Sequence, residues 1–328
     1  MESLINKSYK ILKSLQLNNH LFLASPSEKT SYRKIWIRDN LYVIYGVEAI
    51  DHNEAENIMH SLFDLMIKHE NKLDSIKTIP KNINEYIHAR YDPMTLDEFK
   101  ENWGNNQNDA IGLFLFRAGE FLEKGINLRE GEMRILNKLV KYLEIIEYWH
   151  NKDNGMWEEN EEIHSSSIGS CVAGLKKISK YIEVPSDLIK KGEKQLFHQL
   201  PNESEKKDVD LSLLSLIYPY NLLDEKLKKD ILSRIEKRLV KKRGVIRYVG
   251  DKYYNRNGEA EWSMGFPWLA IIYKDINKTK YDYYIKKSIE VMNEKGELPE
   301  LYYSNSDESN DNTPLAWSQA LFIKALKK

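Results

Sequence analysis

The chain has 328 residues with 49 basic and 50 acidic side chains, and a formal net charge of −1 argues against binding to nucleic acid or to an anionic membrane surface. Its single cysteine, Cys171, excludes an internal disulfide and a cysteine metal cluster, and the scattered histidines suggest neither a metal site nor a cofactor. No segment reaches the ~18 uncharged apolar residues of a membrane helix, and the N-terminus lacks the apolar run of a signal peptide, so we expect a cytoplasmic protein.

Apolar residues recur at helical spacing along the whole chain. The spacing predicts twelve helices and no strand, at roughly 3–16, 39–50, 52–72, 107–123, 131–150, 164–182, 186–199, 208–217, 224–241, 261–274, 277–294 and 313–327. No linker or low-complexity tract divides them, so we expect a single domain over residues 1–328, without a separate β-sandwich or starch-binding domain.

The predicted helices alternate in character. Segments such as 131–150 and 224–241 carry one charged face, whereas 164–182, 261–274 and 313–327 are apolar on more sides. Six hairpins of one exposed and one buried helix can close into a ring, the all-α (α/α)6 toroid. An open solenoid of helical pairs is the alternative, although the sequence shows no repeat of fixed period.

Unusual aromatic and polar residues gather in the segments that precede the buried helices. In a closed ring these six segments meet at one end, and the connections at the other end, such as 50–55, carry nothing comparable. The candidates in chain order are Trp36, Arg38 and Asp39; Trp103, Gln107 and Asp109; Trp157, Glu158 and Glu159; Asp208 and Asp210; Arg247, Glu261 and Trp262; and Glu300, Tyr302 and Trp317.

Each candidate also has a structural explanation. Asp39, Asp109 and Asp210 can be helix caps or first-turn acids, and Glu159 belongs to an acidic run that can be a solvated face. Capping does not explain why only one end of the ring is enriched. The convergence predicts a pocket of carboxylates, amides, arginines and tryptophans, which suits a sugar ring with an apolar face and a polar rim.

The segment 155–159, Gly-Met-Trp-Glu-Glu, is the most informative of the six. It places the carboxyl of Glu158 beside the indole of Trp157 in a loop that contains a glycine. A carboxylic acid partly shielded from water by an aromatic ring can hold a proton for donation.

The motifs in this order resemble those of glycoside hydrolase family 15, the glucoamylase-like family, which also includes similar domains of the phosphorylase kinase α and β subunits. The resemblance covers residues 30 to 328. It rests on W-I-R-D (36–39), W-G-x-x-Q-N-D (103–109), G-M-W-E (155–158), S-S-S-I-G (165–169), V-D-L-S-L-L (209–214), R-Y-x-G-D-x-Y-Y (247–254), L-P-E (298–300) and P-L-x-W-S-x-A (314–320).

The resemblance implies an (α/α)6 barrel that hydrolyses α-glucosidic bonds from non-reducing ends with inversion. By position, Glu158 corresponds to the general acid and Glu300 to the general base. Arg38 and Asp39 correspond to the pair that binds the terminal glucose, Trp103 to a tryptophan that packs on the substrate, and Arg247 to an arginine of the sugar site. The other residues expected to line the pocket are Trp36, Gln107, Asp109, Trp157, Glu159 and Tyr302.

The chemistry of inversion agrees with these roles. An acid must protonate the leaving oxygen while a base activates water at the opposite face of the sugar, with the two carboxyls roughly 6.5–9.5 Å apart. We expect Glu300 to stay ionised beside Tyr302, Asn305 and water. The expected ligand is a short α-glucan or an α-linked glucose disaccharide. Leu301, where many members of the family have glutamine, keeps open the alternative of a catalytically silent glucan-binding regulatory protein.

Overall fold

The computed structural model describes residues 2–327. Its contacts divide the chain into two compact units. Unit 1 consists of Met1–Ile58, Val209–Tyr218 and Leu223–Lys328, and unit 2 of Met59–Asp208 and Pro219–Leu222. The single domain over residues 1–328 stays a prediction.

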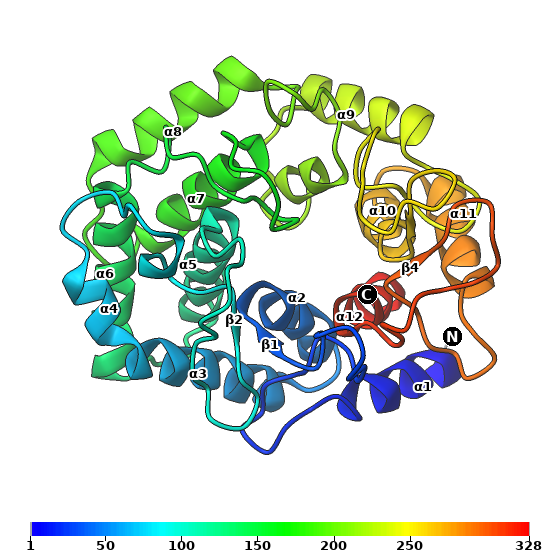
Figure 1. The fold of residues 1–328 in the computed structure, drawn as a ribbon, viewed down its shortest axis with the longest axis horizontal. Helices are drawn as coiled ribbons and strands as arrows, with labels where there is room; N and C mark the ends of the chain where they lie inside the picture. Colours follow the sequence, from blue (N-terminus) through cyan, green and yellow to red (C-terminus); the bar gives the residue numbers. More distant parts are fainter. Residues whose placement is uncertain (1, 328) are drawn as a thin grey trace. The chain divides into compact units, whose positions relative to one another are not determined.

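Unit 1 is built around helices that lie far apart in the sequence. Helices α2 and α12 lie side by side, and α12 also packs against α1 and α10 (Figure 1). Strand β3 pairs antiparallel with β4, with Glu261 opposite Tyr302 and Trp262 opposite Leu301. The elements of this unit are α1 (Glu2–Lys13), β1 (Ile35–Trp36), α2 (Ile37–Glu48), η2 (Leu211–Leu216), α9 (Glu225–Arg238), β3 (Glu261–Trp262), α10 (Gly265–Tyr273), α11 (Lys278–Glu290), β4 (Leu301–Tyr302) and α12 (Ala316–Leu326).

Unit 2 is centred on the pair α5 and α7, which run side by side, with α8 against α7 and α6 against α5 (Figure 1). Its elements are α4 (Glu70–Ser75), η1 (Ile83–Glu85), β2 (Arg90–Tyr91), α5 (Asn108–Glu123), α6 (Glu130–Ile145), α7 (Ser165–Ile178) and α8 (Ser186–Gln199). Helix α3 (His52–Lys68) is shared between the two units.

The predicted alternation of exposed and buried helices is confirmed. Every residue of α2 is buried, and α5, α7, α10 and α12 are buried over most of their surface. Helices α6, α8 and α9 instead bury one apolar stripe and expose charged residues. The difference follows from the width of the apolar face in each sequence segment.

Two predictions of local structure are wrong. Residues 208–217 do not form a regular helix. They form the short 3-10 helix η2, which begins where the Asp210 side chain accepts a hydrogen bond from the Ser212 amide at 2.8 Å. The described residues also contain four strands of two residues each, where none was expected. Such short strands carry no alternating pattern, because they arise where loops pair.

Within residues 2–327, every helix is too short or too polar to span a bilayer.

Helices α5 and α7 approach so closely that Gly112 has no room for a side chain. A methyl group there would lie 2.3 Å from the carbonyl carbon of Ser170 and 2.4 Å from the amide nitrogen of Cys171. Because these are backbone atoms, we expect Gly112→Ala to lower the free energy of unfolding by about 3 kcal/mol, measured by denaturant unfolding. In the control variant Gly131→Ala, the nearest atom to the methyl group would be Ile67 Cδ1 at 3.4 Å, an ordinary contact distance, and stability should hardly change. Equal stability of the two variants would contradict the close packing.

Candidate active site

The candidate residues lie in both units of the chain. Unit 1 holds Trp36, Arg38, Asp39, Arg247, Glu300 and Tyr302. Unit 2 holds Trp103, Gln107, Asp109, Trp157, Glu158 and Glu159.

The carboxyl of Glu300 is fully buried and surrounded by hydrogen-bond donors. Its Oε2 accepts hydrogen bonds from the side-chain amides of Asn310 and Asn312, the latter at 2.7 Å. Its Oε1 faces the hydroxyl of Tyr253 at 3.4 Å, and the Tyr253 hydroxyl lies 2.9 Å from that of Tyr32. Since an amide nitrogen can only donate, the two asparagines favour an ionised carboxylate.

Burial and hydrogen bonding act on Glu300 in opposite directions. Burial raises the pKa of Glu300 above its ordinary value, and the hydrogen bonds from Tyr32, Asn312 and Asn310, together with the charge of Arg247, counteract this rise only in part. Burial and the charge of Glu300 in turn raise the pKa of Tyr32 well above its usual range. Tyr32 therefore remains a protonated hydroxyl that can donate. The expectation that Tyr302 and Asn305 are the protein neighbours of Glu300 was wrong, because Tyr253, Asn310 and Asn312 contact its carboxyl.

A buried ion pair lies next to this carboxylate. Arg247 donates two hydrogen bonds to Asp251, from Nε at 2.7 Å and from Nη2 at 2.6 Å, and both side chains are buried. The guanidinium carbon of Arg247 also lies 4.8 Å from the ring centre of Tyr253 and 5.2 Å from that of Trp262. The bidentate pair fixes the orientation of Arg247, which places a positive charge beside the tyrosine that contacts Glu300.

The W-I-R-D motif forms the start of α2. Trp36 is the residue before the helix, and Arg38 and Asp39 lie buried in its first turn. The ring of Trp36 lies 5.3 Å from that of Tyr32, so the motif reaches the tyrosine cluster at Glu300.

Tyr302 and Leu301 point away from the carboxyl of Glu300. The hydroxyl of Tyr302 donates to the carbonyl of Val291 at 2.8 Å, and its ring stacks with the guanidinium of Arg243. Leu301 is fully buried in the pair formed by β3 and β4. We therefore leave Tyr302 out of the proposed site.

In unit 2, Glu158 lies at the tip of a loop whose backbone is held by Asn154. The side chain of Asn154 donates to the carbonyl of Glu159 at 2.6 Å and accepts from the amide of Asn106 at 3.2 Å. Glu158 itself has φ +61°, in the left-handed region that non-glycine residues seldom adopt. Such strained positions cluster at functional sites, where the surroundings hold them in place.

Trp103 is the partner of the Glu158 carboxyl. Its indole Nε1 donates a hydrogen bond to Glu158 Oε2. The indole ring of Trp103 is held by Arg90, whose guanidinium lies 3.7 Å from the ring centre. Nη2 of Arg90 donates to Glu101 at 2.5 Å. Arg90 is almost completely buried. The stack fixes the indole plane and hence the direction of its N–H group.

The other candidates of unit 2 are buried next to these loops. Gln107 donates from Nε2 to the carbonyl of Gly104 at 2.6 Å, and a methyl group at Gly104 would lie 2.8 Å from the carbonyl oxygen of Glu158. Asp109 lies in the first turn of α5, and Trp157 is buried in the Glu158 loop.

The sequence profile of the glycosyl hydrolases family 15 matches residues 11–324. The chain belongs to this family. It is also similar to the probable phosphorylase b kinase regulatory subunit alpha of Caenorhabditis elegans, with 23% identity over 369 residues that cover 88% of this chain and 30% of that protein. The chain thus spans less than a third of the length of that relative.

Solved structures with similar folds include glycosidases. A glycosidase variant in complex with glucose superposes with a TM-score of 0.85 at 17% identity, covering 98% of this chain and 95% of that chain. The glucoamylase of Hormoconis resinae has a TM-score of 0.74 at 13% identity, covering 99% of this chain and 72% of that chain. This likeness in fold confirms the predicted all-α (α/α)6 class of family 15.

In this family 15 chain, sequence reasoning missed several residues that contact the two candidate glutamates. Tyr32, Asn310 and Asn312 lie in polar, turn-like segments that give no signal of their own. Arg90 was also missed; its guanidinium lies over the ring of Trp103, the partner of Glu158. Within residues 2–327, no group of three or more His, Cys, Asp or Glu residues is arranged to hold a metal ion.

Proposed function

We propose that this family 15 member is an inverting, exo-acting α-glucosidase. It releases β-glucose from the non-reducing end of a short α-glucan or of an α-linked glucose disaccharide, with Glu158 as general acid and Glu300 as general base. The observation that carries the proposal is the contrast between the two carboxyls. Glu158 is half-buried and accepts a hydrogen bond from the indole of Trp103, whereas Glu300 is fully buried among amide and hydroxyl donors, with the charge of Arg247 acting on it.

The surroundings of Glu300 suit a base. Its Oε2 is occupied by Asn310 and Asn312, so Oε1, with its longer contact to Tyr253, is the oxygen that would take a proton from water. A raised pKa makes the carboxylate a better proton acceptor, as long as it stays ionised at the working pH. Arg38, Asp39, Trp36 and Arg247 would bind the terminal glucose in the same unit.

The neighbours of Glu158 orient its carboxyl, as a general acid requires. Trp103, held by Arg90, fixes one carboxyl oxygen, and Trp157 shields the loop from water. Gln107, Asp109 and Glu159 are the further residues of this unit to which we assign contact with the sugar. A glucose complex of a fold neighbour supports glucose as the ligand class.

The first product distinguishes the mechanisms. Incubation with maltose, isomaltose, kojibiose, trehalose or dextran, followed by proton NMR within the first minutes, should show β-glucose from at least one substrate before mutarotation. α-Glucose as the first product would exclude inversion. The same panel identifies the linkage.

A second candidate function has support from the relatives. The Caenorhabditis elegans protein is named a regulatory subunit, which favours a glucan-binding protein without turnover. Calorimetric binding of maltose, with no glucose formed after prolonged incubation, would establish this alternative in place of the hydrolase.

A further inference from the structure

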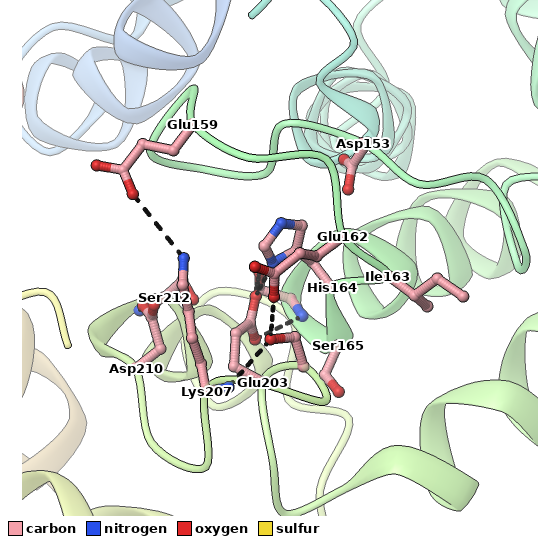
Figure 2. Close-up of polar contacts among 12 residues, drawn as sticks. Asp153, Glu159, Glu162, Ile163, His164, Ser165, Glu203, Lys207, Asp210 and Ser212 are labelled. Atoms are coloured by element: carbon pink, nitrogen blue, oxygen red, sulfur yellow. Dashed lines mark hydrogen bonds and ion pairs between the residues drawn. The ribbon is translucent and has the colours of Figure 1, made fainter. Parts of the chain in front are cut away.

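The turn at 203–207 lies directly against the loop that carries Glu158, although its sequence, Glu-Ser-Glu-Lys-Lys, has the composition of an exposed charged turn. The turn is closed by backbone hydrogen bonds from the amides of Glu203 and Ser204 to the carbonyl of Lys207, at 2.9 and 3.1 Å. Glu203, Ser204 and Lys207 are nevertheless buried, whereas Glu205 and Lys206 are exposed. The side chains of Glu203 and Lys207 point toward residues 159–166 (Figure 2).

Glu203 contacts the residues that connect the loop carrying Glu158 (residues 154–161, the acid loop) to α7. Its carboxylate accepts from the hydroxyl of Ser166 at 2.6 Å and from the Ser166 amide at 3.1 Å, and it lies 3.2 Å from Nδ1 of His164. Although burial opposes it, the Glu203 hydrogen bond and the charge of Asp153 raise the pKa of His164 to about 9. His164 is thus an imidazolium at neutral pH.

The ring of His164 in turn packs against Gly155, near the start of the acid loop. A methyl group at Gly155 would lie 2.8 Å from Nε2 of His164, so the ring packs against the backbone of Gly155. Gly155 has φ +61°, which a side chain would strain. The position of this glycine therefore depends on the ring that Glu203 holds.

Ser204 anchors the residue that closes the loop. Its hydroxyl donates to the carboxylate of Glu162, which is buried. The backbone of Glu162 pairs with that of Asp153 through two hydrogen bonds of 2.9 and 3.0 Å. This bridge closes the loop of residues 154–161 at its base, so Ser204 acts on the closing residue.

Lys207 reaches the tip of the loop. Its Nζ lies 4.0 Å from Oε2 of Glu159, the residue after the candidate acid, and the lysine side chain is only 8% exposed. Figure 2 shows this contact on the side of the loop away from Asp153. The contact between a buried ammonium and a partly exposed carboxylate limits the rotamers of the Glu159 side chain.

We propose that the turn 203–207 is a clamp that positions the acid loop, and that Lys207 is a positioning residue that acts through Glu159. Glu203 holds His164 and Ser166, and Ser204 holds Glu162, all on the C-terminal side of the loop. Lys207 orients the carboxylate of Glu159. The kinetic consequence rests on the proposed function, in which Glu159 contacts the sugar.

Hydrogen exchange of the full chain tests the clamp without any substrate. In Ser204→Ala and Lys207→Met, amides of residues 154–162 should exchange ~10-fold faster or more than in the wild type, while those of α5 stay unchanged. Lys206→Met is the matched control, since Lys206 belongs to the same turn but its side chain is 76% exposed, so that water screens its 4.0 Å contact with Glu162. Wild-type exchange of the loop in both clamp variants would overturn the proposal, whatever the enzyme does with sugars.

A double-mutant cycle then separates positioning from general destabilisation. We expect Lys207→Met and Glu159→Gln each to lower kcat/KM for the cleaved disaccharide ~10-fold, and the double variant to lose no more than either. Lys207→Arg should retain most of the activity, because it keeps the charge. Additive losses, or an unchanged kcat/KM in Lys207→Met, would refute the role of Lys207. If the wild type gives no product, the same cycle is measured as the Kd of maltose by calorimetry. Absence of both turnover and binding would refute the proposed function. The hydrogen-exchange result would still decide whether the turn 203–207 is a clamp.

Discussion

Glu158→Gln is expected to lower kcat for the cleaved disaccharide by on the order of 10²–10⁴-fold, while the substrate still binds. A carboxamide has the shape of the carboxyl but no proton to give to the leaving oxygen. Its oxygen can still accept the hydrogen bond from Trp103, so the left-handed backbone of the loop should persist. Steady-state kinetics together with calorimetry in the absence of turnover measures both effects.

The same variant should regain activity on a substrate whose leaving group needs no proton. α-Glucosyl fluoride is such a substrate, and the loss in kcat for it should be far smaller than the loss for the disaccharide. Glu161→Gln is the control, because Glu161 is an exposed acid of the same loop. Retention of most of the disaccharide activity in Glu158→Gln would remove Glu158 from the role of acid.

The helices of this fold could be predicted from the sequence because their signal is local. The apolar spacing in 107–123 and 164–182 predicts the buried pair that the structure shows as α5 and α7. Residues 208–217 are also rich in apolar residues. Only Leu211–Leu216 are helical, however, as the 3-10 helix η2 that Asp210 caps through the Ser212 amide. The two-residue strands were not predictable, since they depend on which loops meet and not on a pattern within either loop.

Part of the candidate site could be predicted because its motifs are also local in the sequence. Glu158 and Glu300 stand in motifs that can be recognised, and Trp103 was expected to pack on the substrate. The partners of Glu300 were missed, because Tyr32 lies at the opposite end of the chain and Asn310 belongs to a polar run typical of turns. Tyr302 was favoured for its closeness in sequence, but its hydroxyl bonds to Val291.

Removing the base should have an effect of the same size. We expect Glu300→Gln to lower kcat by on the order of 10²–10⁴-fold. The carboxamide can keep its oxygen toward Asn312 and its nitrogen toward the hydroxyl of Tyr253, which can accept, so the fold around it should persist. Glu308→Gln, an exposed acid of the same segment, should behave as the wild type.

The pH dependence gives an independent measure of this role. Because burial raises the pKa of Glu300, activity should fall as the pH decreases through a value above that of an ordinary glutamate, where the base becomes protonated. Asn312→Leu removes a donor that favours the ionised carboxylate, so the acid limb of kcat/KM should move to still higher pH. In Glu300→Gln this limb should disappear from the residual activity. An acid limb that persists unchanged in Glu300→Gln would assign the base to another residue.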